Sequence, residues 1–86
     1  MSELVARVYV TPKRGILDPQ GKAVQQSLRT LGFDEVHDVR VGRFILLRVE
    51  ADSPTGAEER VRAMCERLLA NKLIEDFQVQ IEANGH

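Results

Sequence analysis

The chain has too few cysteines for a disulfide framework and no apolar run long enough for a membrane helix. Its 86 residues include one cysteine, Cys65, which has no second thiol to pair with inside the chain. No segment approaches the roughly 18 consecutive apolar residues of a membrane helix. Met1-Ser2-Glu3 lacks the basic start of a secretory signal. We therefore expect a cytoplasmic protein with a single domain over residues 1–86.

The signatures of common catalytic and cofactor sites are also missing. The sequence contains no glycine-rich dinucleotide loop, no phosphate-binding P-loop, no HExxH zinc motif and no paired cysteines. Cys65 falls on an apolar helical stripe, and we interpret it as core packing, because burial raises the pKa of a thiol. His37 and Asp38 are neighbours on an expected strand and would point to opposite faces. We expect no catalytic residue, no metal site and no cofactor site in this chain.

The overall charge is nearly balanced but unevenly placed. A net charge of −1 argues against general nucleic-acid binding. Residues 1–48 hold eight Lys/Arg against five Asp/Glu, while residues 49–86 hold four against eight. Such asymmetry suits contacts between unlike surfaces of two chains, although a short sequence also produces it by chance.

Hydrophobic periodicity predicts six elements in the order β-α-β-β-α-β. The expected strands are residues 4–10, 36–41, 44–50 and 77–82, with Gly42-Arg43 as a hairpin signal between the middle two. The expected helices run over residues 19–31 and from about Ser53 to Asn71. This order predicts an α+β, ferredoxin-like split sandwich, in which two helices cover one face of a four-stranded antiparallel sheet.

Local signals support the first helix. Asp18 can cap its N-terminus, Pro19 suits its first position, and Gly32 suits the left-handed residue after its end. Its apolar stripe carries Val24, Leu28 and Leu31, which we expect to face the sheet. The stripe of the second helix is expected to comprise Ala57, Val61, Met64, Cys65 and Leu68.

The strand at 44–50 divides its side chains between two faces. Ile45, Leu47 and Val49 should face the core, because the other parity would bury Arg48 and Glu50. The hairpin before it should then contain an odd-numbered loop or a bulge.

The same division leaves three large side chains on the sheet face away from the helices. These residues are Tyr9, Phe44 and Leu46. A split sandwich covers only one face of its sheet, so this apolar set needs a partner. We expect Tyr9, Phe44 and Leu46 to form an oligomer interface.

Lys13, Arg14 and Lys22 flank the expected start of the first helix. Such a cluster can meet an anionic group. Phosphate binding, a contact with another protein and a solvated loop all remain open, and a glycine-rich phosphate cradle is absent.

Three residue strings, in chain order, carry a family resemblance: TPKRGILDPQGKAVQQSLRTLGF, GFDEVHDVRVGRFILLRVE and MCERLLANKLIEDFQVQIE. They resemble the PurS family, the small subunits of phosphoribosylformylglycinamidine synthase. Together they span nearly the whole chain. Pro12 and Lys72 depart from the family pattern, and both lie at the ends of expected elements.

The resemblance implies a role in the fourth step of de novo purine synthesis. There a multi-chain ligase uses ATP, magnesium and glutamine to convert formylglycinamide ribonucleotide to its amidine. It also implies that a large synthetase subunit holds the nucleotide site and that a glutaminase subunit releases ammonia. The PurS-like chain would have no active site; it would form dimers or tetramers, bridge the other two subunits and assist ammonia transfer. Its expected contacts with them are Lys13, Arg14 and Gln20.

Two other classes of protein share the expected element order. An RNA-binding module would stack bases on Tyr9 and Phe44, but residues 43–48 do not match the aromatic motif of such modules. A small-molecule regulatory domain of the ACT type is the second alternative. Salt-dependent RNA binding would favour the first, and stabilisation by an amino acid would favour the second.

Overall fold

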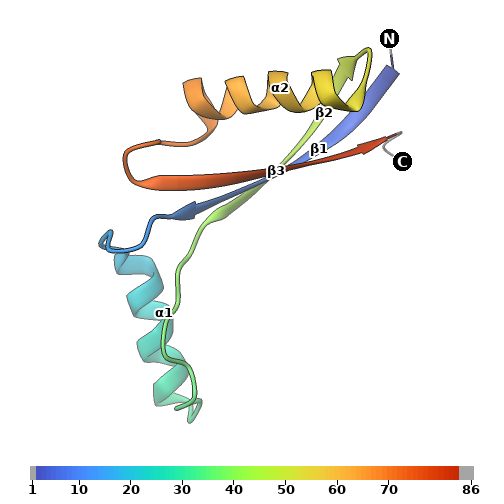
Figure 1. Cartoon of the computed structure of the whole chain (residues 1–86). Helices are drawn as coiled ribbons and strands as arrows, with labels where there is room; N and C mark the ends of the chain where they lie inside the picture. The colour runs from blue at the N-terminus through green and yellow to red at the C-terminus, as the bar shows by residue number, and fades with distance from the viewer. Residues whose placement is uncertain (1, 84–86) are drawn as a thin grey trace.

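Three antiparallel strands form one sheet in the computed structural model, which describes residues 2–83 (Figure 1). The elements are β1 (Ser2–Pro12), α1 (Pro19–Thr30), β2 (Arg43–Ala51), α2 (Pro54–Met64), the π-helical turn η1 (Cys65–Leu69) and β3 (Glu75–Ala83). Strand β1 lies in the centre, with β2 on one side and β3 on the other. The predicted α+β class is confirmed, and three of the predicted strands form within a residue or two of their expected bounds.

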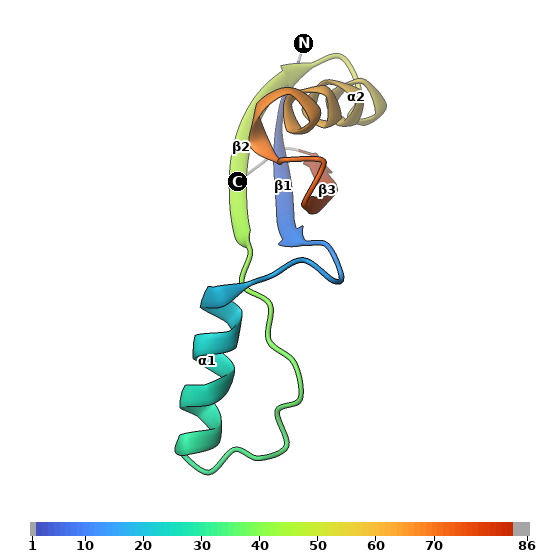
Figure 2. The same cartoon turned by 90° about the vertical axis from the view of Figure 1, so that its left-hand side faces the viewer.

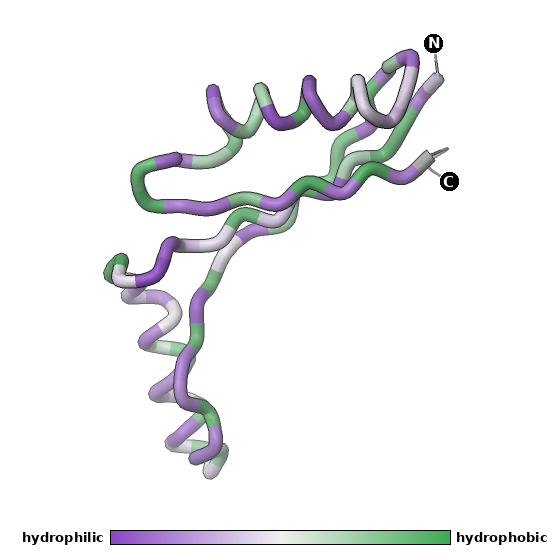
Figure 3. Tube along the Cα trace, viewed as in Figure 1, coloured by the Kyte–Doolittle hydropathy of each residue, from purple (hydrophilic) through white to green (hydrophobic). Residues whose placement is uncertain are grey.

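The pairing register confirms the predicted division of the sheet into two faces. On the face toward α2, Val8 lies opposite Ile45 in β2 and Val79 in β3. On the other face, Tyr9 lies opposite Phe44. Val8 is fully buried, whereas Phe44 is 53% exposed. The alternation of apolar and polar residues along each strand is visible in Figure 3.

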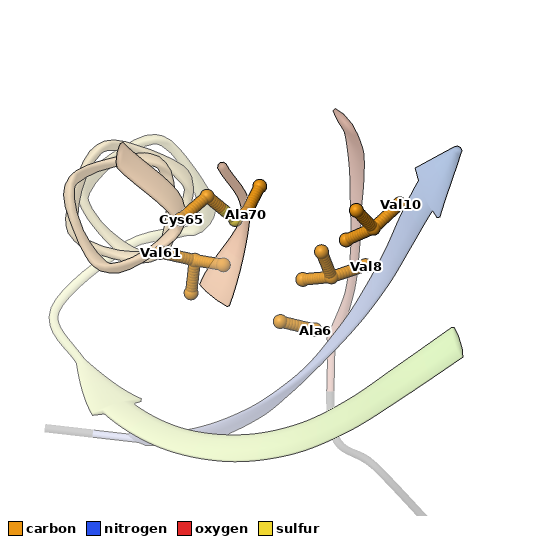
Figure 4. Close-up of a cluster of buried hydrophobic side chains, with 6 residues drawn as sticks. All are labelled: Ala6, Val8, Val10, Val61, Cys65 and Ala70. Carbon is orange, nitrogen blue, oxygen red and sulfur yellow. The ribbon is translucent and has the colours of Figure 1, made fainter. Parts of the chain in front are cut away.

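Within residues 2–83, the helical cover of the sheet comes from α2 and from η1, which continues it. Ser53 caps α2 by accepting a 3.0 Å hydrogen bond from the Gly56 N–H, and Pro54 occupies the first position of this helix. The core cluster lies between this helix and β1 and consists of Ala6, Val8, Val10, Val61, Cys65 and Ala70 (Figure 4). All of these side chains are small, so the buried core is thin for a chain of this length.

The π-helical turn η1 changes which side chains continue the core stripe. The Ala70 N–H donates to the Cys65 carbonyl, a five-residue step that adds a residue to the turn. As a result Leu69 packs against the core, while Leu68 is 82% exposed. The prediction that Leu68 lies on the buried stripe is therefore wrong.

The predicted fourth strand does not form in the described chain. Residues 36–41 make no strand pairing, and Gly42-Arg43 is not a hairpin turn but an extended entry into β2. The side chain of Arg40 donates to the Pro12 carbonyl, so the segment is held at the exit of β1. It therefore does not reach the outer edge of β2, where the ferredoxin-like order would require the fourth strand.

Helix α1 does not cover the sheet either, which corrects the expectation of two helices on one face. It points away from the sheet, and residues 31–42 return beside it in both views (Figures 1 and 2). We call α1 and this return segment the arm. Among the apolar stripe of α1, Leu28 is half-buried but Leu31 is 72% exposed. The predicted end of the helix is confirmed, since Gly32 has φ 101° and the Phe33 N–H donates to the Leu28 carbonyl.

The arm makes the molecule long and thin. Its principal extents are 51 × 29 × 14 Å, and its Cα radius of gyration is 16.3 Å. A compact domain of this length has a radius of gyration of roughly 12 Å. The chain by itself therefore leaves much of its apolar surface without cover.

Replacement of Cys65 by alanine should lower the free energy of unfolding by about 1–2 kcal/mol, because a small buried side chain is lost from the core. Burial also raises the pKa of the Cys65 thiol. The native wild-type thiol should therefore react slowly with a thiol reagent, and the same protein in denaturant should react fast. Equal rates in the two states would show that Cys65 is accessible.

Candidate functional site

The carboxylate of Asp18 ties the two chain segments at the base of the arm to each other. Its Oδ1 accepts a 3.0 Å hydrogen bond from the Gly21 N–H, which caps α1 as predicted. Its Oδ2 accepts a 3.0 Å hydrogen bond from the Val41 N–H on the return segment. Both bonds hold the pKa of Asp18 below its ordinary value, and the bond from Gly21 has the larger effect. One side chain thus fixes both chain segments that connect the arm to the sheet.

Two glycines permit the close approach of the backbone at this junction. A Cβ on Gly21 would lie 2.3 Å from the Val39 carbonyl oxygen, and a Cβ on Gly42 would lie 2.0 Å from the Val10 carbonyl oxygen. Neither distance accommodates a side chain, and both clashes would be with backbone atoms. Glycine at these positions brings α1 and the end of β1 against the return segment.

A basic pocket of about 350 Å³ lies beside the junction. It is lined by the β1–α1 loop, the first turns of α1 and the return segment. We call this hollow the basic pocket. Its lining residues are Lys13, Arg14, Gly15, Ile16, Leu17, Asp18, Lys22, Gln25, Asp38, Val39 and Arg40. The structure thus brings the predicted Lys13, Arg14 and Lys22 together, and it adds Arg40.

The four cations of the basic pocket differ in their partners. The Lys13 ammonium lies 2.8 Å from Asp76 Oδ1 on β3, and Arg40 Nε lies 3.5 Å from Asp38 Oδ2. Arg14 and Lys22 form no ion pair with the residues of 2–83. The pocket therefore has an excess of positive charge that is concentrated on two side chains.

Gln20 does not join the predicted pair Lys13 and Arg14. It lines a second hollow of about 380 Å³, on the other side of the ridge formed by Ile16, Leu17 and Asp18. The predicted partner contact therefore spans two neighbouring hollows and a ridge.

The open face of the sheet presents the three predicted apolar side chains. The Tyr9 and Phe44 rings lie 5.2 Å apart between centroids at an interplanar angle of 34°. Leu46 is 59% exposed on the same strand as Phe44. Polar contacts border this patch: Tyr9 Oη donates to Gln80 Oε1 at 3.3 Å, and Arg7 pairs with Glu82. The face is an apolar patch within a polar frame.

The remaining candidates for chemistry are separate from one another. His37 and Asp38 lie on the return segment instead of a strand, and the His37 carbonyl accepts from Gln25 Nε2 at 3.1 Å. Within residues 2–83, no group of three or more His, Cys, Asp or Glu side chains is placed to hold a metal ion. No helix in that part of the chain is long and apolar enough to cross a membrane.

Sequence reasoning missed the role of Arg43, which it assigned to a hairpin loop. Its guanidinium contacts both Glu75 carboxylate oxygens, at 2.7 and 3.0 Å, and the Leu69 carbonyl at 2.6 Å. The bond from Arg43, aided by the Asn71 N–H, lowers the pKa of Glu75. This clamp fixes the connection from η1 to β3. The only signal for it was a lone arginine and a lone glutamate at the ends of separate strands.

The chain matches known proteins over nearly its whole length. A family model described as PurS, phosphoribosylformylglycinamidine (FGAM) synthase, matches residues 5–83. The phosphoribosylformylglycinamidine synthase subunit PurS of Bacillus subtilis is 45% identical over 76 residues, which cover 88% of this chain and 89% of the relative.

Solved structures agree with this match. The structure of Thermus thermophilus PurS has a TM-score of 0.84 at 36% identity and covers 96% of this chain and 99% of its own. A chain in the structure of PurLQS from Thermotoga maritima has a TM-score of 0.86 at 30% identity, with 95% and 100% covered. The fold and these likenesses place the chain among small α+β proteins that are subunits of a larger enzyme. The chain belongs to the PurS family of phosphoribosylformylglycinamidine synthase.

Loss of the Asp18 carboxylate should free the base of the arm while leaving the sheet intact. In Asp18→Ala, amide hydrogen exchange at Gly21 and Val41 should accelerate, because both N–H groups lose their acceptor, while exchange at Val8 should stay slow. Asp38→Asn is the matched control, since the Asp38 carboxylate is near Arg40 but accepts neither of these bonds.

The same contact has a defined pH dependence. Because the pKa of Asp18 is lowered in the folded chain, its stabilising effect is complete above the ordinary aspartate value of about 3.9 and is lost as pH falls through the lower folded value. The protection of the Gly21 and Val41 amides, taken relative to their intrinsic exchange rate at each pH, should fall in that range. Unchanged protection in both the variant and acid would contradict the assigned role of Asp18.

Proposed function

We propose that this chain is the non-catalytic small subunit of a phosphoribosylformylglycinamidine synthase complex in purine biosynthesis. In this role the complex carries out the ATP-, magnesium- and glutamine-dependent formation of the amidine, while this chain supplies no catalytic, metal or cofactor residue. Membership of the PurS family supports the assignment to the complex. A cytoplasmic location is part of the same proposal.

The observation that supports a non-catalytic role is that the largest apolar side chains lie on the surface while small ones fill the core. The fully buried side chains are no larger than valine and cysteine, whereas several leucines and phenylalanines are exposed. An enzyme with its own site needs a rigid, enclosed set of reactive groups. This chain instead presents wide apolar and basic surfaces, which are features of a component that is completed by other chains.

The expected partners are the large synthetase subunit, the glutaminase subunit and a second copy of this chain. A relative of this chain occurs in the structure named PurLQS from Thermotoga maritima, which supports assembly with PurL and PurQ. We propose that this chain bridges those two subunits and assists ammonia transfer between them. Lys13, Arg14 and Gln20, which border the ridge at residues 16–18, are the proposed contacts with them.

We further propose that the open sheet face is the surface for the second copy. Burial of Tyr9, Phe44 and Leu46 would each contribute on the order of 1.5–3 kcal/mol per protomer if complete. The polar frame around the patch, including the Arg7–Glu82 pair, would then form the rim of the interface.

Sedimentation should give a dimer or tetramer for the wild-type chain at micromolar concentration. Leu46→Asp should shift the distribution toward monomer, because it places a charge within the apolar patch. Its circular dichroism should remain that of the folded chain, since Leu46 is mostly exposed in the protomer. Glu50→Ala, on the same face of the same strand but at its exposed end, is the control. A monomeric wild type would contradict this proposal.

The isolated chain should show no ATPase, glutaminase or amidation activity. Added to purified large and glutaminase subunits, it should restore glutamine-dependent amidation. The rate of amidine formation with and without the chain is the measurement. A full rate in the absence of this chain would refute the subunit function.

A further inference from the structure

We propose that the basic pocket binds an acidic segment of a partner chain, in which a carboxylate side chain lies next to an aliphatic one. The proposal rests on the proposed subunit function and names the chemistry of one of its contacts. It concerns the basic pocket, which Arg14 and Lys22 line, and it leaves the open sheet face to the second copy.

The charge of the pocket is the first argument. Its two carboxylates are already engaged, because both oxygens of Asp18 accept backbone N–H bonds and Asp38 lies 3.5 Å from Arg40. Arg14 and Lys22 come from the loop and from α1 and have no anionic partner within residues 2–83. The charge without a partner is therefore positive. A carboxylate placed between Arg14 and Lys22 would give both side chains an anionic partner.

The apolar rim is the second argument, and it favours a polypeptide. Leu17 is 79% exposed at the edge of the pocket, and Ile16 beside it is 37% exposed. An inorganic anion or a sugar phosphate would leave this rim in water. A peptide that carries an aliphatic side chain next to its acidic residue would cover Leu17 while its carboxylate reaches the cations.

The backbone around the pocket is the third argument, and it disfavours a phosphate. Phosphate sites at helix starts use free N–H groups. Here the N–H groups of Gly21 and Lys22 both donate to Asp18, and Pro19 has none. The Ile16 N–H donates to the Lys13 carbonyl. The start of α1 thus offers the pocket no cradle of backbone donors, and the charged groups that line the pocket are side-chain cations beside an apolar edge.

The walls of the pocket are also fixed before any partner binds. The bonds of Asp18 to Gly21 and Val41, together with the contact of Gly21 with Val39, hold α1 at a set distance from the return segment. Gln25 adds a bond to the His37 carbonyl further along the same two segments. A preformed pocket loses little conformational freedom on binding, which favours a specific contact.

Zero-length carbodiimide crosslinking of the reconstituted complex tests the proposal. This reagent joins an amine to a carboxylate that touches it, so Lys22 should become linked to an Asp or Glu of the large or glutaminase subunit. Lys22→Arg is the matched control, since it keeps the charge but removes the amine. It should remove the link without changing assembly. Lys72 serves as an internal reference, because its Nζ lies 4.0 Å from Glu66 Oε1 of its own chain.

Affinity for the subunit that carries the crosslink provides the second readout. Arg14→Ala with Lys22→Ala should weaken binding about tenfold at low salt, and the effect should shrink as salt rises. Leu17→Ser should also weaken binding. The pair Arg29→Ala and Arg60→Ala makes the same change in net charge outside the pocket and should leave the affinity within about twofold.

The outcomes separate this proposal from the subunit function. If the wild-type chain assembles but Lys22 does not link to a partner, and the pocket variants bind as tightly as the control pair, the pocket assignment is overturned and the subunit function stands. If inorganic phosphate displaces the partner far more strongly than chloride at equal ionic strength, the pocket is a phosphate site instead. A wild-type chain that binds neither subunit would overturn both proposals.

Discussion

The architecture depends on the carboxylate of Asp18, which accepts one hydrogen bond from the start of α1 and another from the segment that leads into β2. Helix caps usually satisfy one end of one helix. Here the same carboxylate also holds the return segment, which leads from the arm into β2. Because Gly21 and Gly42 allow the backbones to touch at this point, the arm leaves the sheet at a defined place. The basic pocket exists because these two segments are held together.

An arm held away from the sheet leaves the core incomplete. Helix α2 covers the centre of one sheet face, while the apolar stripe of α1 and the patch with Phe44 and Leu46 remain exposed. The radius of gyration of 16.3 Å, well above that of a compact domain of the same length, expresses the same fact. Exposed apolar area of this extent is costly in water, so the native state of the chain should include its partners. The need to cover this apolar area is a physical reason for the chain to act as a subunit.

Local signals predicted most of the elements, and tertiary constraints decided the rest. Alternation gave the three strands and both of their faces, and the capping residues Asp18 and Gly32 gave the bounds of α1. The error at residues 36–41 has a definite cause. Val39 and Val41 alternate like a strand, but Arg40 donates to the Pro12 carbonyl at the end of β1 and the Val41 N–H donates to Asp18 at the start of α1. No periodicity encodes that choice. For the site, clustering of Lys13, Arg14 and Lys22 followed from their nearness in sequence, whereas Arg40 and the clamp of Arg43 on Glu75 depend on long-range folding.

The central claim is that other copies of this chain complete its fold, and the concentration dependence of thermal unfolding tests it most directly. If a second copy covers the apolar surfaces, folded state and oligomer are linked by mass action, so a dilution of about 100-fold should lower the midpoint of unfolding. Leu46→Asp should reduce both the midpoint and its dependence on concentration. A midpoint that is the same at every concentration for the wild-type chain would show that the protomer is stable by itself, and it would contradict the account.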